Sequence, residues 1–337
     1  MGRVTTILLL TVLLSVSGVD AQITSYGQYA DTLSTSYGTG SFVWAWIHLP
    51  SDFFLRPAKK YPLIFFFHGA GQASIGGENA LDSLIGTTSP NALQGAGPAW
   101  LINQGDSMNF YNYATQDTDR PIIVSPQFPG WSATGPAIDV MIGDLLYGKS
   151  RFAGRIDSNR ISLTGLSAGG QGAFDELSGF DDDGCRCLFH KVHKIASAVL
   201  MSAALDHSTA EMPAYPNIIA DSTRLWGMGS LIDIHGISTL EIVDSIDAYA
   251  GGAAAYLTPA YYEFPNTGSY YESTSGHCCW LAEYEPTFTQ VINGHPLNVY
   301  QFMLSHSRVG LSPSPPVSDL HPAGGLPRHR AAKVKLN

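Results

Sequence analysis

Residues 160–172 constrain the fold of this chain more than any other segment. A short apolar run there leads into Gly165-Leu166-Ser167-Ala168-Gly169 and a further small residue, Gly170. The pattern G-x-S-x-G between a strand and a helix is typical of a strained turn that lifts a serine hydroxyl clear of a sheet. Its glycines leave room where a Cβ would collide. We therefore predict a buried strand at residues 160–164, a helix at 170–177, and Ser167 as a nucleophile between them; a Gly/Ser turn without chemistry is the alternative.

Apolar runs elsewhere in the chain predict further strands, and apolar residues at helical spacing predict helices. We expect strands at residues 41–49 (an edge strand), 61–67, 121–125, 161–166, 195–201, 224–228 and 261–264, and helices at 138–147, 170–177 and 238–249. Strands that alternate with helices form βαβ units, so we predict an α/β fold with a mostly parallel central sheet flanked by helices. Residues 70–119 are expected to hold active-site loops and at least one helix, and the polar residues 22–40 a surface lead-in.

The two ends of the chain differ in character from its middle. Arg3 precedes an apolar stretch at residues 7–16 that is too short to span a bilayer, and small residues ending at Ala21 suit a cleavage site. We predict a signal peptide at residues 1–21, cleavage after Ala21, and a secreted or periplasmic protein without a membrane anchor. Residues 310–337 are Pro/Ser-rich and basic, which is typical of a linker-like tail. Residues 22–309 would then form the folded domain.

Composition and charge narrow the class of partner. The chain of 337 residues is 45% hydrophobic and 14% charged, which fits a folded globular protein. Its formal net charge of −10 argues against nucleic acid as a partner, because phosphate binding needs a basic face.

The four cysteines form two tight groups, Cys185 with Cys187 and Cys278 with Cys279. Export would make oxidation favourable, and neighbouring cysteines rarely bridge each other, so at least one bridge between the two groups is a hypothesis. Four free or locally paired thiols are the equal alternative. A metal site at Cys185, Cys187, His190 and His193 matches ligand spacing, but the same stretch suits a surface segment leading into a strand, so we expect no metal.

A serine nucleophile needs a base within hydrogen-bond reach, and the base needs an orienting carboxylate. With this kind of turn the chain order is serine, then acid, then histidine. Asp233 is the candidate acid, because it follows the strand expected at 224–228. Asp221 precedes that strand, and Asp244 and Asp247 fall within the next helix.

His277 is the candidate base among eleven histidines. It comes after Asp233, beside a glycine, in the loop that follows the last short strand expected. His295 and His306 fall in or near the closing helix, and His235 is too close to Asp233 in sequence to complete a triad easily.

The same logic places an oxyanion hole. One donor would be the backbone N–H of Ala168, the residue after the nucleophile, and the other that of Ala70, in the small-residue loop after the strand at 61–67. A Gly-rich turn without this role is the alternative for Ala70. Trp131 and Tyr111 are weaker candidates for lining the substrate pocket, because aromatic residues more often belong to a core.

Several of these segments match patterns of one group of enzymes. The chain has YPLIFFFHGAGQ where the group has YPLIVFLHGAGE, Pro126-Gln127 after the next strand, and DSNRISLTGLSAGG at the serine turn where the group has DxNRIYLTGLSMGG. It also has G-H-x-x-W at residues 276–280. Over residues 42–308 the chain resembles the α/β-hydrolase superfamily, and within it the secreted phospholipase/carboxylesterase-like and feruloyl-esterase-like serine hydrolases, relatives of the polyhydroxybutyrate-depolymerase-like esterases.

This resemblance implies an α/β-hydrolase fold and hydrolysis of carboxylic esters through Ser167, Asp233 and His277 without a cofactor. It favours acyl or feruloyl esters of polysaccharides, or small esters, as substrates. The loop that carries the candidate acid departs from the group's pattern W-x-x-H-G-x-x-D, because Gly229-Ser230 stands where the group has His-Gly. The insertion at residues 181–187 has no counterpart in the group. A serine peptidase of the same fold, a polyester depolymerase and an inactive exported binding module remain alternatives.

Overall fold

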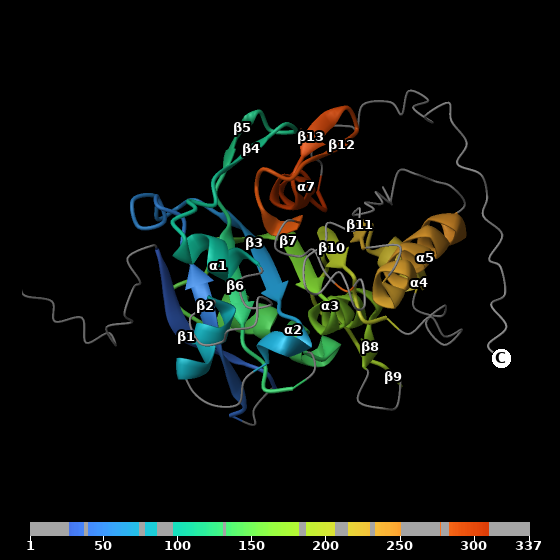
Figure 1. Ribbon diagram of the computed structural model, residues 1–337. Coiled ribbons are helices and arrows are strands. Elements are labelled where there is room, and N and C mark those ends of the chain that lie inside the picture. The colour runs from blue at the N-terminus through green and yellow to red at the C-terminus, as the bar shows by residue number, and fades with distance from the viewer. Residues whose placement is uncertain are drawn as a thin grey trace, which may run out of the picture.

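A seven-stranded sheet forms the centre of the molecule (Figure 1). The computed structural model describes residues 27–36, 40–73, 78–85, 97–130, 133–181, 187–205, 215–229, 233–250, 277 and 283–309. In spatial order the strands are β1 (Gln28–Ser34), β2 (Phe42–His48), β6 (Ile122–Pro126), β3 (Tyr61–Phe67), β7 (Ile156–Leu166), β10 (Ser197–Met201) and β11 (Arg224–Met228). Strand β2 runs antiparallel to both of its neighbours, β1 and β6, and the pairs from β6 to β11 are all parallel.

Helices cover both faces of this sheet because alternate residues of its strands are apolar on both sides. In β3, Leu63, Phe65 and Phe67 belong to one buried cluster, whereas Ile64 and Phe66 belong to another. The first cluster is completed by α2 (Gly135–Gly143), α3 (Ala168–Ser178), α4 (Tyr215–Ala220) and α5 (Ile234–Tyr249), and the second by α1 (Pro98–Asn103) and α7 (Val299–Leu304). This confirms the predicted α/β fold with a mostly parallel sheet flanked by helices.

Short elements complete the described chain. They are the 3₁₀ turns η1 (Ala70–Gln72) and η2 (Glu78–Leu84), a π turn η4 (Asp144–Gly148) that extends α2, and the hairpins β4 (Phe110–Asn112) with β5 (Asp117–Asp119), β8 (Phe180–Asp181) with β9 (Cys187–Leu188), and β12 (Gln290–Ile292) with β13 (His295–Leu297). Within the ranges that the structure describes, no helix combines the length and apolar character needed to cross a bilayer.

Two expectations need correction. Residues 28–34 are not a surface lead-in but strand β1, and it is β1, not the predicted strand at 41–49, that lies at the edge of the sheet. The helix expected at 238–249 begins four residues earlier, at Ile234, because the side chain of Asp233 caps it. The strand expected at 261–264, the signal peptide at 1–21 and the tail at 310–337 lie outside the described residues.

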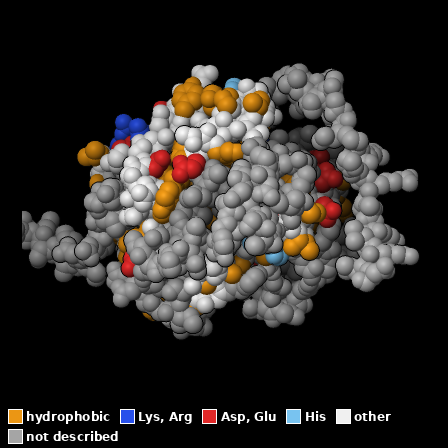
Figure 2. All heavy atoms as spheres, in the orientation of Figure 1, with side chains coloured by type: hydrophobic (Ala, Val, Ile, Leu, Met, Phe, Trp, Pro, Cys, Tyr) orange, Lys and Arg blue, Asp and Glu red, His pale blue; other side chains and the backbone are white. Residues whose placement is uncertain are grey.

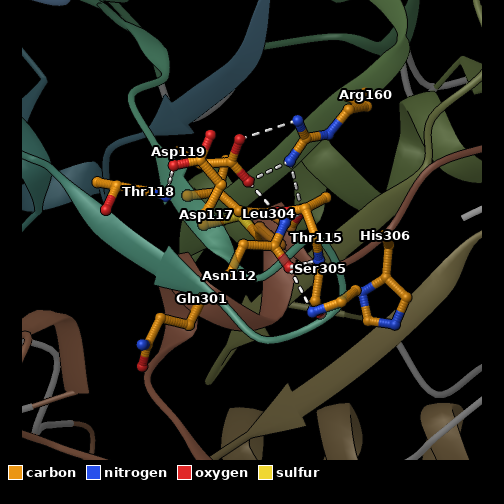
Figure 3. Close-up of polar contacts among 12 residues, drawn as sticks. Asn112, Thr115, Asp117, Thr118, Asp119, Arg160, Gln301, Leu304, Ser305 and His306 are labelled. Carbon is orange, nitrogen blue, oxygen red and sulfur yellow. Dashed lines mark hydrogen bonds and ion pairs between the residues drawn. The ribbon is translucent and has the colours of Figure 1, made fainter.

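A partly buried ionic cluster fixes one end of the molecule (Figure 3). Arg160, in the first half of β7 (Ile156–Leu166), pairs with Asp119 of β5 and donates to the carbonyl of Leu304 at the end of α7. Asn112 of β4 joins the same carboxylate and the same carbonyl, at 2.6 and 2.8 Å. The arginine thereby ties the β4–β5 hairpin and α7 to the central sheet. In Figure 1 this hairpin and β12–β13 stand at the top, and β3 and β7 point away from them.

Two buried histidines lead us to expect that acid destabilises the fold. Burial lowers the pKa of His48 to about 4 and that of His68 to about 4, against 6.5 for an ordinary histidine. Because the unfolded chain binds these protons at higher pH, their contribution to stability is present above pH 6.5 and is lost as the pH falls toward 4. We expect the free energy of unfolding, measured by urea denaturation, to fall by on the order of several kcal/mol across this window.

The free energy of unfolding of the variant His68→Asn should change less with pH than that of the native protein, because the variant has one fewer buried histidine that titrates. Stability that stays constant between pH 6.5 and 4 in the native protein would contradict the expectation.

Candidate active site

Ser167 lies at the carboxyl end of β7, between that strand and α3. Its backbone has φ 53° and ψ −123°, a conformation that L-residues rarely adopt. Two main-chain hydrogen bonds hold it there: its N–H donates to Met201 at 3.0 Å and its carbonyl accepts from Ala204 at 2.9 Å. These hydrogen bonds to the end of β10 and the residues after it hold Ser167 in the strained turn that the sequence pattern predicts.

The glycines on either side of Ser167 are required by contact distances. A Cβ on Gly165 would collide with the backbone of Gly169, and one on Gly169 would collide with the carbonyl of Phe67 at the end of β3. Both collisions are with backbone atoms, which cannot move aside as a flexible side chain can. The turn crosses so close to the sheet that only glycine fits at these two positions.

A chain of hydrogen bonds joins three residues from distant parts of the sequence. The Nε2 atom of His277 lies 2.9 Å from Ser167 Oγ, and its Nδ1 atom lies 2.8 Å from Asp233 Oδ2. With Nδ1–H donating to the carboxylate, Nε2 is the acceptor that faces the serine hydroxyl. The structure thus brings together the three residues that the sequence proposed, in the order and polarity that proton transfer from a serine requires.

Asp233 is held as an anion in a buried position. It lies just after β11 at the N-cap of α5, where its carboxylate accepts from the backbone N–H groups of His235 and Gly236, both at 3.1 Å. Burial by itself would raise the pKa of Asp233, but the hydrogen bond and charge of His277, together with the His235 N–H, leave that pKa below its usual value. The aspartate is therefore ionised wherever His277 can act as a base.

A second buried carboxyl lies near the triad, and sequence reasoning did not identify it. Glu283 is 1% exposed, and neither of its carboxylate oxygens has a hydrogen-bond partner. Burial, and then the charge of Asp233, raise its pKa well above the usual value. The raised pKa favours the protonated, uncharged form of Glu283. The next residue, Tyr284, anchors this segment to β7 by a 2.8 Å hydrogen bond to Thr164.

The two candidate oxyanion donors flank Ser167. Ala168 is the first residue of α3, where backbone N–H groups have no partner within the helix. Ala70 begins the η1 turn, directly after Gly69, and a Cβ built on Gly69 would lie 3.4 Å from the Cβ of Ser167. The loop after β3 therefore approaches the serine closely enough to share a site with it.

A buried polar network holds the loop that carries Ala70. His68 Nε2 accepts from the N–H of Phe128 at 2.9 Å, so its Nδ1–H donates to the carbonyl of Gly69 at 2.8 Å. Gln127 donates to the carbonyl of Gln72 at 2.6 Å and accepts from Ser83 at 3.0 Å. The side chains of His68, Gln127 and Ser83 thus join the loops that follow β3 and β6.

Tyr111 is not brought to the triad, which corrects the expectation that it lines the substrate pocket. It is a half-exposed residue of β4, and its ring packs edge-on against Tyr113 at 5.1 Å. The ionic cluster holds this hairpin at Arg160 of β7, and Ser167 follows the carboxyl end of that strand seven residues later, roughly 20 Å away at about 3.3 Å per residue. Figure 2 shows hydrophobic side chains exposed at this end of the molecule.

The rival carboxylates, and the rival histidines His295 and His306, lie away from Ser167. Asp221 pairs with Lys191 at 2.6 Å and with Lys194 at 3.3 Å. His295 stacks on Tyr113 at 4.5 Å, beside the β4–β5 hairpin. Asp244 and Asp247 are on α5, and His306 follows α7.

Several predictions fall on residues that the structure does not describe. They concern Trp131 and the cysteines Cys185, Cys278 and Cys279, so the disulfide hypothesis stays a prediction. Across the described ranges, no three His, Cys, Asp or Glu side chains lie together as a metal site would require.

Comparison with known proteins gives only distant similarities. No family model matches the chain, and no curated protein matches it. Among solved structures, a thermostable esterase is 21% identical with a TM-score of 0.49, covering 83% of this chain and 63% of its own. A ferulic acid esterase is 16% identical with a TM-score of 0.42, covering 82% and 97%. A hyperthermophilic esterase from the archaeon Pyrobaculum calidifontis is 14% identical with a TM-score of 0.39, covering 69% and 75%.

Proposed function

We propose that this protein is a serine hydrolase of carboxylic esters that works through an acyl-enzyme. The observation that supports this most directly is the hydrogen-bonded chain from Ser167 through His277 to Asp233, at 2.9 and 2.8 Å. A serine hydroxyl is a weak nucleophile, and an imidazole at this distance can remove its proton as it attacks.

The reaction follows from these contacts. Ser167 Oγ attacks the ester carbonyl carbon while its proton moves to Nε2 of His277. The carbonyl oxygen becomes an oxyanion, which the N–H groups of Ala70 and Ala168 stabilise; one such donor is typically worth about 10²- to 10³-fold in rate. The intermediate collapses, the ester C–O bond breaks, and His277 protonates the departing alcohol.

The second half of the cycle repeats these roles with water. His277 takes a proton from a water molecule that attacks the acyl-enzyme carbonyl, and returns a proton to Ser167 Oγ as the carboxylic acid leaves. Asp233 stabilises the imidazolium in both halves and fixes which ring nitrogen carries the proton. No step requires a cofactor.

The family resemblance carried by residues 61–72, 157–170 and 276–280 favours acyl or feruloyl esters of polysaccharides, or small esters, as substrates. The predicted signal peptide at 1–21 would place the enzyme in the periplasm or outside the cell, where such esters are accessible. A serine peptidase of the same fold would use the same three residues and is the rival activity.

An assay on purified protein separates these activities. We expect hydrolysis of p-nitrophenyl acetate, p-nitrophenyl butyrate or methyl ferulate, no cleavage of peptide p-nitroanilides, and attachment of a fluorophosphonate probe to the peptide that contains Ser167. Preferential cleavage of the anilides would favour the peptidase. Absence of both labelling and turnover would favour the inactive binding module.

A further inference from the structure

His235 is a second imidazole beside the candidate base. It is the second residue of α5, and its ring centroid lies 4.9 Å from that of His277, with the ring planes at 57°. Its backbone N–H donates to Asp233 Oδ1 at 3.1 Å, and its carbonyl accepts from Thr239 at 2.8 Å. These contacts hold the main chain of His235 at the start of α5, and its ring lies against the ring of His277.

The surroundings of His235 favour its neutral form. Burial lowers its pKa, the charge of His277 lowers it further, and Asp233 opposes both effects. Burial, and then the charge of Asp233, raise the pKa of Glu283, which favours its uncharged form. The neutral ring of His235 can therefore sit against an imidazolium at His277, an arrangement that aromatic rings favour.

Protonation of His235 would have the opposite effect. During acylation His277 acquires a positive charge as it takes the serine proton, and a cation at His235 would lie in contact with that developing charge. Like charges in a half-buried site repel more strongly than in water. The transition state would lose stabilisation although His277 itself was still neutral and able to accept the proton.

We propose that His235 is a positioning residue for His277, and that its protonation, like that of His277, switches off the proposed hydrolysis. The inference rests on the proposed function, since it assigns His277 as the base. It adds a residue outside the Ser, Asp, His set, one that its short sequence distance from Asp233 had excluded as a triad member.

Two substitutions separate packing from titration. In His235→Phe a neutral ring still faces His277, so we expect kcat at neutral pH within about threefold of the native value and KM unchanged. In His235→Gln the ring contact is lost, so we expect kcat to fall by roughly tenfold, again with KM unchanged, because small displacements of a base are costly. At low pH, kcat of the native protein should fall by nearly 100-fold per pH unit, because two histidines become protonated. In both variants only His277 titrates, so kcat should fall by about tenfold per pH unit.

The kinetic readout is the rate at which Ser167 reacts with a fluorophosphonate as a function of pH, measured alongside ester turnover. His190→Gln is the matched control, because His190 is exposed and in a different segment; its acid limb should equal that of the native protein. An acid limb in His235→Phe and His235→Gln identical to the native one would overturn the proposal.

A second readout does not depend on catalysis. In an NMR titration of the full chain, His277→Gln should raise the pH at which His235 titrates, because it removes the positive charge that His277 acquires. A His235 titration that is unchanged in His277→Gln would show that the rings are not coupled and would also overturn the proposal. If Ser167 reacts with no probe and no ester is cleaved, the proposed function fails, and the titration alone decides whether the histidines are coupled.

Discussion

Ser167→Ala is expected to lower kcat for ester hydrolysis by about 10⁴-fold or more, because loss of the nucleophile prevents acylation and leaves only binding and oxyanion contacts. KM should change little, since the methyl group of alanine leaves the rest of the site in place. The fluorophosphonate probe should no longer attach to the protein.

The substitution is a clean one because the fold does not depend on the hydroxyl. Ser167 is held in its strained conformation by main-chain hydrogen bonds to Met201 and Ala204, and alanine can make both. Circular dichroism and the urea midpoint should therefore match those of the native protein. Ser245→Ala, which removes a hydroxyl bonded to Glu241 within α5, is the matched control and should retain full activity. Native-like turnover in folded Ser167→Ala protein would refute the proposed function.

The central sheet was predictable because its strands carry a strong signal. A strand buried on both faces must be apolar at every position, and β3 shows this as the uninterrupted run YPLIFFF. The serine turn was predictable because collisions with the backbone restrict Gly165 and Gly169 to glycine. In both cases a local requirement leaves a local pattern in the sequence.

Elements whose positions depend on distant partners were harder to predict. Strand β1 reads QYADTLS, with only Tyr29 and Leu33 as buried large apolar residues, so its composition resembles a surface segment. The start of α5 is obscured by Gly236 in its first turn, and only the capping role of Asp233 explains it. Tyr111 lies far from Ser167 because its hairpin, β4–β5, is held by the pair between Asp119 and Arg160. These two residues are 41 positions apart, and no local sequence pattern predicts their contact.

The positions of His235 and Glu283 near the triad could not be predicted from the sequence, because they depend on how distant segments come together in the fold. Sequence order placed Asp233 above its rivals, and the structure puts it 2.8 Å from His277, but sequence order says nothing about the residues that surround a carboxylate once the chain has folded. His235 is two residues from Asp233 and 42 from His277, yet its ring lies against the ring of His277.

Asp233→Asn is expected to reduce kcat by about 10⁴-fold with little change in KM. An amide can donate a hydrogen bond to Nδ1 of His277, which favours the tautomer with hydrogen on Nε2 and leaves no acceptor facing Ser167. The loss also removes the negative charge that stabilises the imidazolium during both halves of the reaction. Steady-state kinetics on p-nitrophenyl butyrate, with kcat and KM determined separately, measure the effect.

Asp233→Asn should have little effect on the stability of the fold, although it lowers kcat strongly. Asp233 caps α5 by accepting from two backbone N–H groups, and asparagine is as good an N-cap as aspartate. The carbonyl oxygen of the new amide can keep one of those bonds, so α5 should still begin at Ile234. Asp244→Asn, on an exposed turn of the same helix, is the matched control and should leave kcat unchanged. Greater damage from Asp244→Asn or Asp221→Asn than from Asp233→Asn would mean that a different carboxylate orients the base.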